Sequence, residues 1–275
     1  MPPSEPVLSD MRDIQSRQGA VPKWALILGA SSGFGAAVAI ELSAAGYNVY
    51  GVHLDRRETL PHAAEVQQKI RAAGREAVFF NMNAADEEKR CQVIARIQAD
   101  AAEVAVLLHS LAFGALRPLV GAAEVASQRQ MEMTSDVMGH SLVYWARDLV
   151  SNGLMKSGGR IYAMTSEGAG KAIPEYGPVC AAKAILEAHI RQLALELAPH
   201  GITANAIMAG VTDTPALRKI PGNEKLMEYA KARNPHHRLT TPIDVARCIA
   251  VLCNPSTYWM TGNTLRVDGG EGSVG

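Results

Sequence analysis

The stretch from Trp24 to Gly46, WALILGASSGFGAAVAIELSAAG, decides how the rest of the chain is interpreted. Its first five residues are apolar and predict a buried strand over residues 24–28. Apolar residues then recur with helical spacing up to Ala45, and Gly46 stands where helices commonly end in a left-handed residue. The glycines between strand and helix predict a tight turn; they are Gly29, Gly33 and Gly35.

This turn has the properties of a phosphate-binding site. Glycines let the backbone approach a pyrophosphate closely, and a helix N-terminus offers free N–H groups and a partial positive charge. The spacing is G-x-x-x-G-x-G, and the alternative is that the small residues serve only close packing. The residues of the turn expected to contact a dinucleotide are Gly29, Ser31, Ser32, Gly33, Phe34 and Gly35.

Composition and charge argue against several classes of function. The 275 residues are enough for one large α/β domain with a buried core. Lys+Arg and Asp+Glu are both 27, so the net charge of zero favours neither nucleic acid nor a membrane surface as a partner. No apolar run could span a bilayer and the N-terminus lacks a signal-peptide core, so we expect a cytoplasmic protein. The four cysteines have no metal-ligand spacing, so we expect free thiols and no metal.

Strand and helix patterns alternate along most of the chain. Further strands are expected over 48–53, 76–80, 104–108, 159–165, 202–208 and 264–267, and helices over 62–73, 87–99, 126–151, 178–198 and 242–252. This alternation predicts an α/β fold, a Rossmann-type doubly wound parallel sheet with helices on both faces. We expect a single domain over 21–275, with residues 214–241 as a substrate lid, after an N-terminal arm at 1–20 that contains a short helix near 11–17.

Further motifs resemble those of the short-chain dehydrogenases/reductases. The segment 83–86, Asn-Ala-Ala-Asp, stands where that family has Asp-Val-Thr-Asp, and the segment 205–210 stands where it has N-A-I-x-P-G. Thr261-Gly262 and the segment 267–270 match its C-terminal signature. The resemblance covers residues 23–270 and implies an NAD(P)H-dependent oxidoreductase. It implies further cofactor contacts from Asn83, Ala84, His109, Ser110, Leu111, Lys183, Gly210, Thr212 and Thr214.

The catalytic segment resembles a divergent branch of that family, the enoyl-acyl-carrier-protein reductases. The ordinary pattern is Tyr-x-x-x-Lys, but Val179 stands four residues before Lys183, and the nearest tyrosine is Tyr176, which gives Tyr-x6-Lys. The segments 109–113 (HSLAF) and 209–210 (Ala-Gly) also fit that branch. The resemblance implies reduction of an enoyl thioester on acyl carrier protein or coenzyme A, in which Tyr176 hydrogen-bonds the enolate oxygen.

The placement of these two residues is physically reasonable. Pro178 suits the first turn of a helix, so Tyr176 is expected just before the helix and Lys183 one to two turns inside it. The helix is otherwise apolar around Lys183, which indicates a buried lysine. A nearby ammonium is expected to lower the pKa of Tyr176. The alternative for Tyr176 is an ordinary surface-loop residue.

Four other polar residues are candidates for roles in or near the site. Ser166 lies seventeen residues before Lys183 and either assists catalysis or caps a turn. Glu167 is a second catalytic candidate, at a position where enoyl reductases commonly have a tyrosine. His109 is either functional or a hydrogen-bonded core histidine. Asp136 aligns with a helix asparagine of ordinary members and is expected to bind a structural water.

The segment after the second strand is expected to select the cofactor, and it carries both signs of charge. His53 stands at the family's usual position for an acidic, NAD-selecting residue, and Asp55 follows two residues later. Arg56 and Arg57 offer fork-shaped donors suited to a 2′-phosphate. We therefore favour NADP(H), with NAD(H) bound through Asp55 as the alternative.

Three functions stay open from the sequence. The first is an enoyl thioester reductase, the second a carbonyl reductase or alcohol dehydrogenase, and the third a dinucleotide-binding regulator without turnover. The helices expected over 126–151 and 178–198 carry more apolar surface than one sheet face requires. We therefore expect a homodimer or homotetramer.

Overall fold

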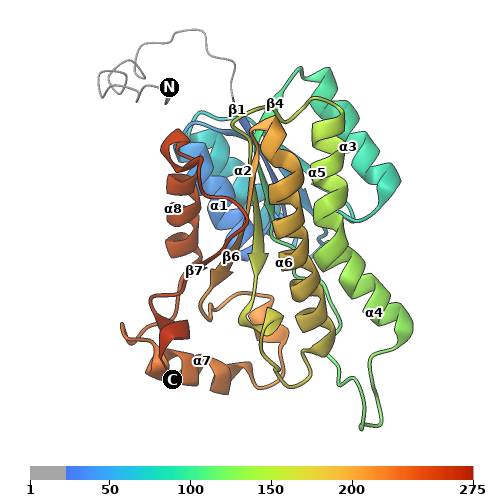
Figure 1. Cartoon of the computed structure of the whole chain (residues 1–275), viewed down its shortest axis with the longest axis vertical. Helices are drawn as coiled ribbons and strands as arrows, with labels where there is room; N and C mark the ends of the chain where they lie inside the picture. The colour runs from blue at the N-terminus through green and yellow to red at the C-terminus, as the bar shows by residue number, and fades with distance from the viewer. Residues whose placement is uncertain (1–22, 275) are drawn as a thin grey trace, which may run out of the picture.

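The computed structural model describes residues 23–274, so the expected arm at 1–20 lies outside the described residues. A seven-stranded sheet forms the centre of the described chain, in the order β3-β2-β1-β4-β5-β6-β7, and every neighbouring pair is parallel (Figure 1). The doubly wound parallel sheet predicted from the sequence is therefore confirmed. The strands are β1 (Lys23–Leu28), β2 (Asn48–His53), β3 (Ala77–Asn81), β4 (Glu103–His109), β5 (Arg160–Thr165), β6 (Thr203–Ala209) and β7 (Thr264–Val267).

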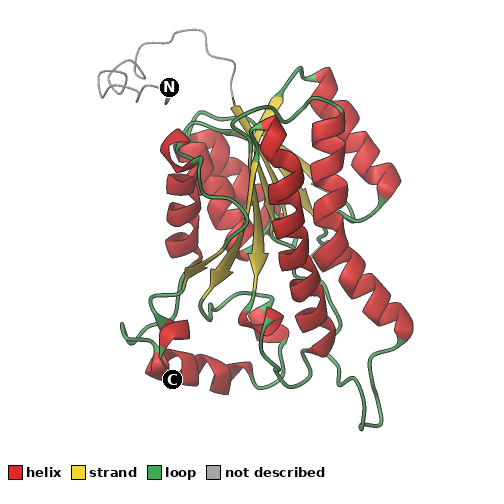
Figure 2. Cartoon of the chain, viewed as in Figure 1, coloured by secondary structure: helices red, strands yellow, loops and turns green. Residues whose placement is uncertain are grey.

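Helices cover both faces of the sheet (Figures 1 and 2). One apolar layer joins the sheet to α1 (Gly33–Ala44), α2 (Leu60–Ala72) and α8 (Pro242–Leu252). The other joins it to α3 (Glu87–Ala99), α5 (Ser141–Ser151) and α6 (Gly177–Leu197). Because the central strands are buried on both faces, they read in the sequence as nearly continuous apolar runs, whereas the edge strand β7 is partly exposed.

The helix expected over 126–151 consists of three segments. α4 (Gln128–Ser135) begins after a capping box between Ser127 and Gln130, and a π turn (Asp136–His140) separates it from α5. The π turn lies very close to α6, because a Cβ added at Gly139 would be 2.9 Å from the side chain of Ile185. The hydroxyl of Ser141 donates to the carbonyl of Val137 at 2.8 Å, which ties the turn together.

The expected lid contains one helix, α7 (Asn223–Arg233), and a 3₁₀ turn at Leu217–Lys219. Figure 1 shows α7 beyond the carboxyl ends of β6 and β7, beside the C-terminal 3₁₀ turn at Glu271–Ser273. Other 3₁₀ turns lie at Glu167–Ala169, Ala198–His200 and Pro255–Thr257. Within residues 23–274, no helix is long and apolar enough to cross a membrane.

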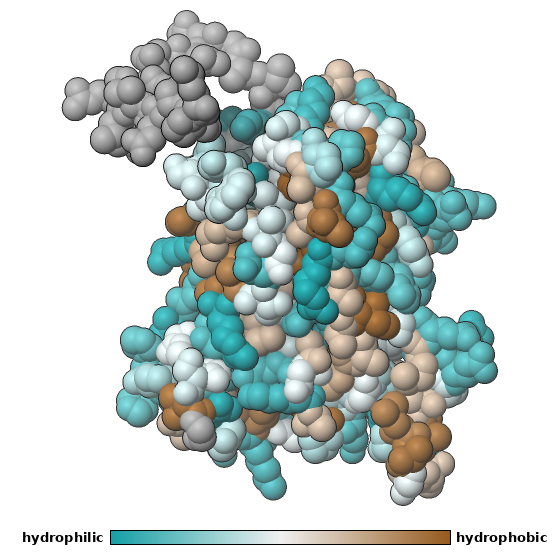
Figure 3. Space-filling model, viewed as in Figure 1, coloured by the Kyte–Doolittle hydropathy of each residue, from teal (hydrophilic) through white to brown (hydrophobic). Residues whose placement is uncertain are grey.

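Large aromatic residues lie both in the core and on the surface. Trp24 stacks on Tyr50 with ring centroids 4.0 Å apart, and Trp145 is completely buried. Trp259, in contrast, is 86% exposed on the single chain. The loop between β4 and α4 also exposes apolar side chains, and Figure 3 shows hydrophobic surface at the lower right corner, where this loop projects. These loop residues are Phe113, Leu119, Val120 and Val125.

Candidate cofactor and active site

The glycine turn lies where the strand order reverses, between β1 and β4, which is the usual ligand-binding crevice of such sheets. Gly29 has a φ of +91°, and its N–H donates to the carbonyl of Val52 at 2.8 Å. A Cβ at Gly29 would collide with the carbonyl oxygen of Ser110, and one at Gly35 would collide with the carbonyl oxygen of Gly29. The cradle therefore exists only with glycine at both positions, and its shape fits a dinucleotide pyrophosphate.

The loop after β6 closes the cradle from the opposite side. A Cβ at Gly33 would lie 3.6 Å from the methyl carbon of Thr214, so these two expected cofactor residues are neighbours. Thr212 and Thr214 are buried, and the hydroxyl of Thr212 donates to the carbonyl of Gly210 at 2.9 Å. Ser32 stands at the N-cap of α1 and is exposed at the mouth of the cradle.

Two of the expected cofactor residues, Asn83 and Ala84, lie just after β3. Asn83 is exposed, and its side-chain oxygen accepts a hydrogen bond from the N–H of Ala85 at 3.0 Å. Ala84 is buried, and its carbonyl accepts from the indole of Trp145 at 2.8 Å. Both residues therefore shape the turn at the end of β3, and their contact with the cofactor stays a prediction.

Asp55 is held firmly at the end of β2. Its carboxylate lies 2.7 Å from Nδ1 of the buried His53, and its backbone N–H donates to the side chain of Asn81 at 2.9 Å. Burial acts to raise the pKa of Asp55, but hydrogen bonds from Thr59, Ser31 and His53 outweigh it, so the pKa is lowered. Asp55 is therefore an anion whose oxygens already have partners.

Arg56 and Arg57 follow directly and are both exposed. In the part of the chain that the structure describes, neither guanidinium lies within 4.0 Å of a carboxylate. Their donors are available to a ligand at the same end of β2.

Lys183 is 4% exposed, in agreement with the burial expected from its apolar helix. Its ammonium donates to the carbonyl of Met164 at 2.7 Å and lies 3.4 Å from the carbonyl of Leu111. Burial lowers the pKa of Lys183 to about 8, and the nearby Glu187 acts in the opposite direction. The side chain thus brings a positive charge between the ends of β4 and β5.

Tyr176 occupies the N-cap of α6, just before the helix that carries Lys183. Burial raises the pKa of Tyr176, although the hydroxyl of Ser166 is close enough to act against this. This direction is opposite to the one expected from the sequence, because burial outweighs the hydrogen bond with Ser166. Ser166 also accepts a hydrogen bond from the N–H of Gly168 at 3.1 Å, so it caps the 3₁₀ turn while facing the phenol. Glu175, just before Tyr176, has a strained φ of +58°.

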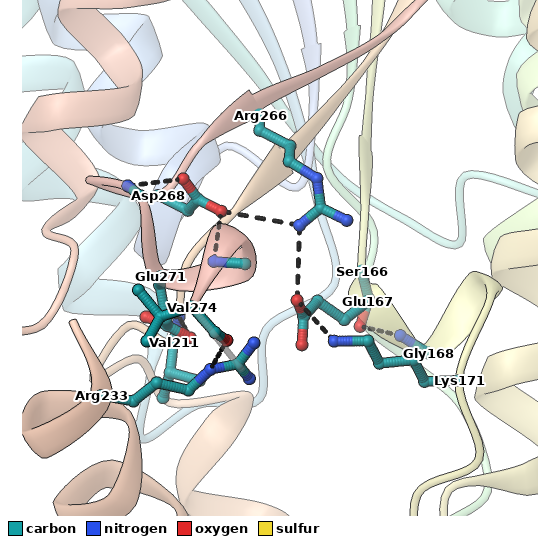
Figure 4. A network of polar contacts seen from close by, with 12 residues as sticks. Ser166, Glu167, Gly168, Lys171, Val211, Arg233, Arg266, Asp268, Glu271 and Val274 are labelled. Atoms are coloured by element: carbon teal, nitrogen blue, oxygen red, sulfur yellow. Dashed lines mark hydrogen bonds and ion pairs between the residues drawn. The ribbon is translucent and has the colours of Figure 1, made fainter. Parts of the chain in front are cut away.

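Glu167, the second catalytic candidate, pairs with two cations. Its carboxylate accepts from Lys171 at 3.0 Å and from Arg266 on β7 at 3.3 Å (Figure 4). Burial acts to raise the pKa of Glu167, but the hydrogen bond and charge of Lys171, with help from Arg266, lower it. These contacts favour the anionic form of Glu167 and tie the loop after β5 to β7, and its catalytic role stays a prediction.

The same network extends to the C-terminal segment (Figure 4). Arg266 also lies 3.6 Å from Asp268, and Arg233 of α7 donates to the carbonyl of Val274 at 2.7 Å. The buried Glu271 accepts from the N–H of Val211, directly after β6. The end of the chain thus braces the loops around the crevice.

Asp136 lies at the start of the π turn. Its carboxylate accepts a hydrogen bond from the hydroxyl of Tyr144 of α5 at 2.9 Å, and the expected bound water stays a prediction. Sequence reasoning missed two polar residues near the site. Glu187 accepts from the hydroxyl of Thr165 at 2.7 Å, and its position four residues after Lys183 was a usable signal. Ser141 had no such signal, because its role depends on the π turn.

Comparison with known proteins shows the family of the chain. The family model described as enoyl-(acyl carrier protein) reductase, of the short-chain dehydrogenase/reductase type, matches residues 29–271. The chain belongs to this family. It is an NAD(P)H-dependent oxidoreductase with the short-chain dehydrogenase/reductase fold.

Individual relatives of this short-chain dehydrogenase/reductase have different activities. The NADPH-dependent enoyl-[acyl-carrier-protein] reductase of Staphylococcus aureus is 29% identical over 71% of this chain and 75% of its own. A trihydroxynaphthalene reductase of Pestalotiopsis fici is 27% identical over 90% of this chain and 88% of its own. The crystal structure of the NADH-dependent enoyl-[acyl-carrier-protein] reductase of Aquifex aeolicus superposes with a TM-score of 0.82, at 26% identity over 93% of this chain and 98% of that one.

Proposed function

We propose that this short-chain dehydrogenase/reductase reduces an enoyl thioester, carried by acyl carrier protein or coenzyme A. The observation that supports this most is the position of Tyr176 at the N-cap of α6, ahead of the buried Lys183. The seven-residue separation differs from the ordinary Tyr-x-x-x-Lys pattern of the family. This separation places the phenol of Tyr176 before the first turn of the helix, where it can hydrogen-bond a substrate oxygen.

In this reaction the residues of the site would have separate roles. A bound nicotinamide cofactor supplies the hydride. Tyr176 donates a hydrogen bond to the thioester oxygen as that oxygen becomes an enolate, so it stabilises charge that develops only during the reaction. The hydrogen bond to the carbonyl of Met164, at 2.7 Å, fixes the ammonium of Lys183. Because the contact with the carbonyl of Leu111 is long, at 3.4 Å, the ammonium can still donate to a ribose hydroxyl. The glycine turn and Thr214 hold the pyrophosphate end.

For the cofactor we propose NADP(H). The oxygens of Asp55 are engaged by His53, Ser31 and Thr59, whereas the guanidiniums of Arg56 and Arg57 are exposed. A guanidinium forms strong, bidentate hydrogen bonds to a phosphate. The test compares kcat/KM for NADPH and NADH, before and after replacing both arginines by alanine. A preference for NADH that survives the replacements would assign the ribose to Asp55.

The substrate class is tested by cofactor oxidation. Purified protein is supplied with crotonyl and acetoacetyl thioesters and with simple ketones, and the loss of cofactor absorbance is followed. We expect the crotonyl thioester to be reduced fastest. Faster reduction of the ketones would favour a carbonyl reductase, the candidate supported by the trihydroxynaphthalene reductase among the relatives and by Ser166 beside the phenol.

We also propose that the enzyme works as a homodimer or homotetramer. The helical surface of α4, α5 and α6 contains a pair of half-buried histidines, His140 and His189, whose ring nitrogens lie 3.0 Å apart. Such half-buried groups on a helical face suit contact with a second copy. Light scattering that finds a monomer at micromolar concentration would contradict this proposal.

A further inference from the structure

One buried nitrogen close to the active site has no partner. His109, the last residue of β4, is completely buried, and its Nδ1 makes no hydrogen bond among the described residues. Buried polar atoms in native proteins are nearly always hydrogen-bonded, so an exception indicates a functional constraint or a bound water. Neither the glycine turn nor the pair Tyr176 and Lys183 supplies a hydrogen-bond partner for this nitrogen.

The hydrogen-bond network fixes the tautomer of this histidine. The hydroxyl of Ser141 has a single hydrogen, which it donates to the carbonyl of Val137 at 2.8 Å. At its 2.9 Å contact with Nε2 of His109, Ser141 must therefore accept, so Nε2 carries the hydrogen. Nδ1 is left as a pure acceptor. Burial lowers the pKa of His109 to about 3, so the ring stays neutral and Nδ1 keeps its lone pair.

The ammonium of Lys183 contacts backbone carbonyls that adjoin His109 in the sheet and in the chain. His109 pairs in the sheet with Ala163 of β5, and Lys183 donates to the carbonyl of Met164, the next residue of β5. Its second contact is the carbonyl of Leu111, two residues after His109. The charge of Lys183 also contributes to the lowered pKa of the imidazole.

We propose that His109 is a positioning residue for Lys183: its Nδ1 accepts a hydrogen bond from one buried water that in turn accepts from the ammonium, and Ser141 holds the tautomer that makes this possible. The interaction favours the charged lysine against the burial that disfavours it. It also orients the ammonium toward the ribose. The inference rests on the proposed role of Lys183 in its cationic form.

Few other titratable groups act on the ammonium. Glu187 lies on the same helix and raises the pKa of Lys183. Tyr176 precedes that helix, and Asp136 of the π turn is engaged with Tyr144. A change confined to Nδ1 of His109 should therefore appear in the pH dependence of turnover. Activity that needs charged Lys183 is present below its pKa and is lost as the pH rises through it.

Two amide substitutions of His109 distinguish the role of Nδ1 from that of Nε2. In His109→Asn, the side-chain oxygen can occupy the place of Nδ1, but the contact with Ser141 is lost. In His109→Gln, the amide nitrogen can reach Ser141, but no acceptor remains at the place of Nδ1. We expect the alkaline limb of the pH profile of kcat to stay in place for Asn and to move by about one pH unit toward acid for Gln. Equal shifts for both variants, or no shift for Gln, would overturn the proposal.

The choice of substrate does not affect this comparison. If ketones prove to be the substrates, the proposed enoyl reduction fails, but the two alkaline limbs are measured on a ketone in the same way. A second measurement needs neither turnover nor a variant. Nitrogen NMR of the wild-type protein should show His109 protonated at Nε2 and bare at Nδ1, and the opposite tautomer would refute the inference.

Discussion

Replacing Lys183 by methionine should make the protein more stable at neutral pH while abolishing turnover. Methionine has a similar length and no charge, so it fills the same buried space without the desolvation of an ammonium. Burial lowers the pKa of Lys183 from 10.5 to about 8 in the folded protein. That difference of about 2.5 units corresponds to about 3 kcal/mol of folding free energy that the charged lysine costs.

The pH dependence of this cost has a definite sign. Below about pH 8, lysine is charged in both the folded and the unfolded chain, so the full penalty applies. Between about pH 8 and 10.5, the folded protein loses the proton while the unfolded chain keeps it, so the wild type gains stability relative to the variant. The variant also leaves the carbonyl of Met164 without its 2.7 Å partner, which costs about 1–3 kcal/mol at every pH.

Urea unfolding of both proteins without cofactor, at pH 7 and at pH 10, measures this directly. The stability of Lys183→Met minus that of the wild type should fall by about 2–3 kcal/mol between the two pH values. The exposed Lys69 on α2 provides a matched control, since Lys69→Met should show no such change. A difference for Lys183→Met that is the same at both pH values would refute the reasoning, because the pH-independent loss of the Met164 contact would then explain everything.

Other substitutions test the remaining parts of the site. Gly35→Val should abolish cofactor binding in calorimetry, because its Cβ would collide with the carbonyl of Gly29; unchanged affinity would remove the glycine turn from the site. Tyr176→Phe should reduce kcat by about 100-fold or more, and full activity would place the proton donor elsewhere. Glu167→Gln should leave kcat largely unchanged, since the carboxylate pairs with the cations of Lys171 and Arg266; a large loss of kcat would show that this carboxylate acts in catalysis. Glu175→Gly should raise the urea midpoint by relieving about 1 kcal/mol of backbone strain, and a lower midpoint would show that the φ of +58° is not strained.

The fold could be predicted from the sequence because its signals are local. A strand buried on both faces reads as an apolar run, and β2, α3, α8 and β7 begin and end at the residues expected for them. Gly46 ends the first helix with a φ of +99°, as its position indicated. The π turn at Asp136–His140 was not predicted, since it depends on packing against α6 and not on the sequence of the turn itself.

The candidate site was harder to predict because its details depend on distant parts of the chain. The sequence suggested that Lys183 is buried, but not that burial would raise the pKa of Tyr176. Of the two cations that pair with Glu167, Lys171 is only four residues away, but Arg266 lies 99 residues later in the chain, so the sequence did not indicate that contact. The tautomer of His109 depends on Ser141, 32 residues away, which only the folded helix brings within reach.

The three tryptophans differ in exposure, so their fluorescence can report on the surface of this protein. Trp24 and Trp145 lie in the core, and Trp259 is 86% exposed next to Tyr258. A soluble quencher such as acrylamide should therefore quench the fluorescence of Trp259 but not that of Trp24 and Trp145. If another copy covers the segment around Trp259, that quenchable share of the fluorescence should shrink as the protein is concentrated. The intrinsic emission can thus report, without any label, whether this face is bare or covered.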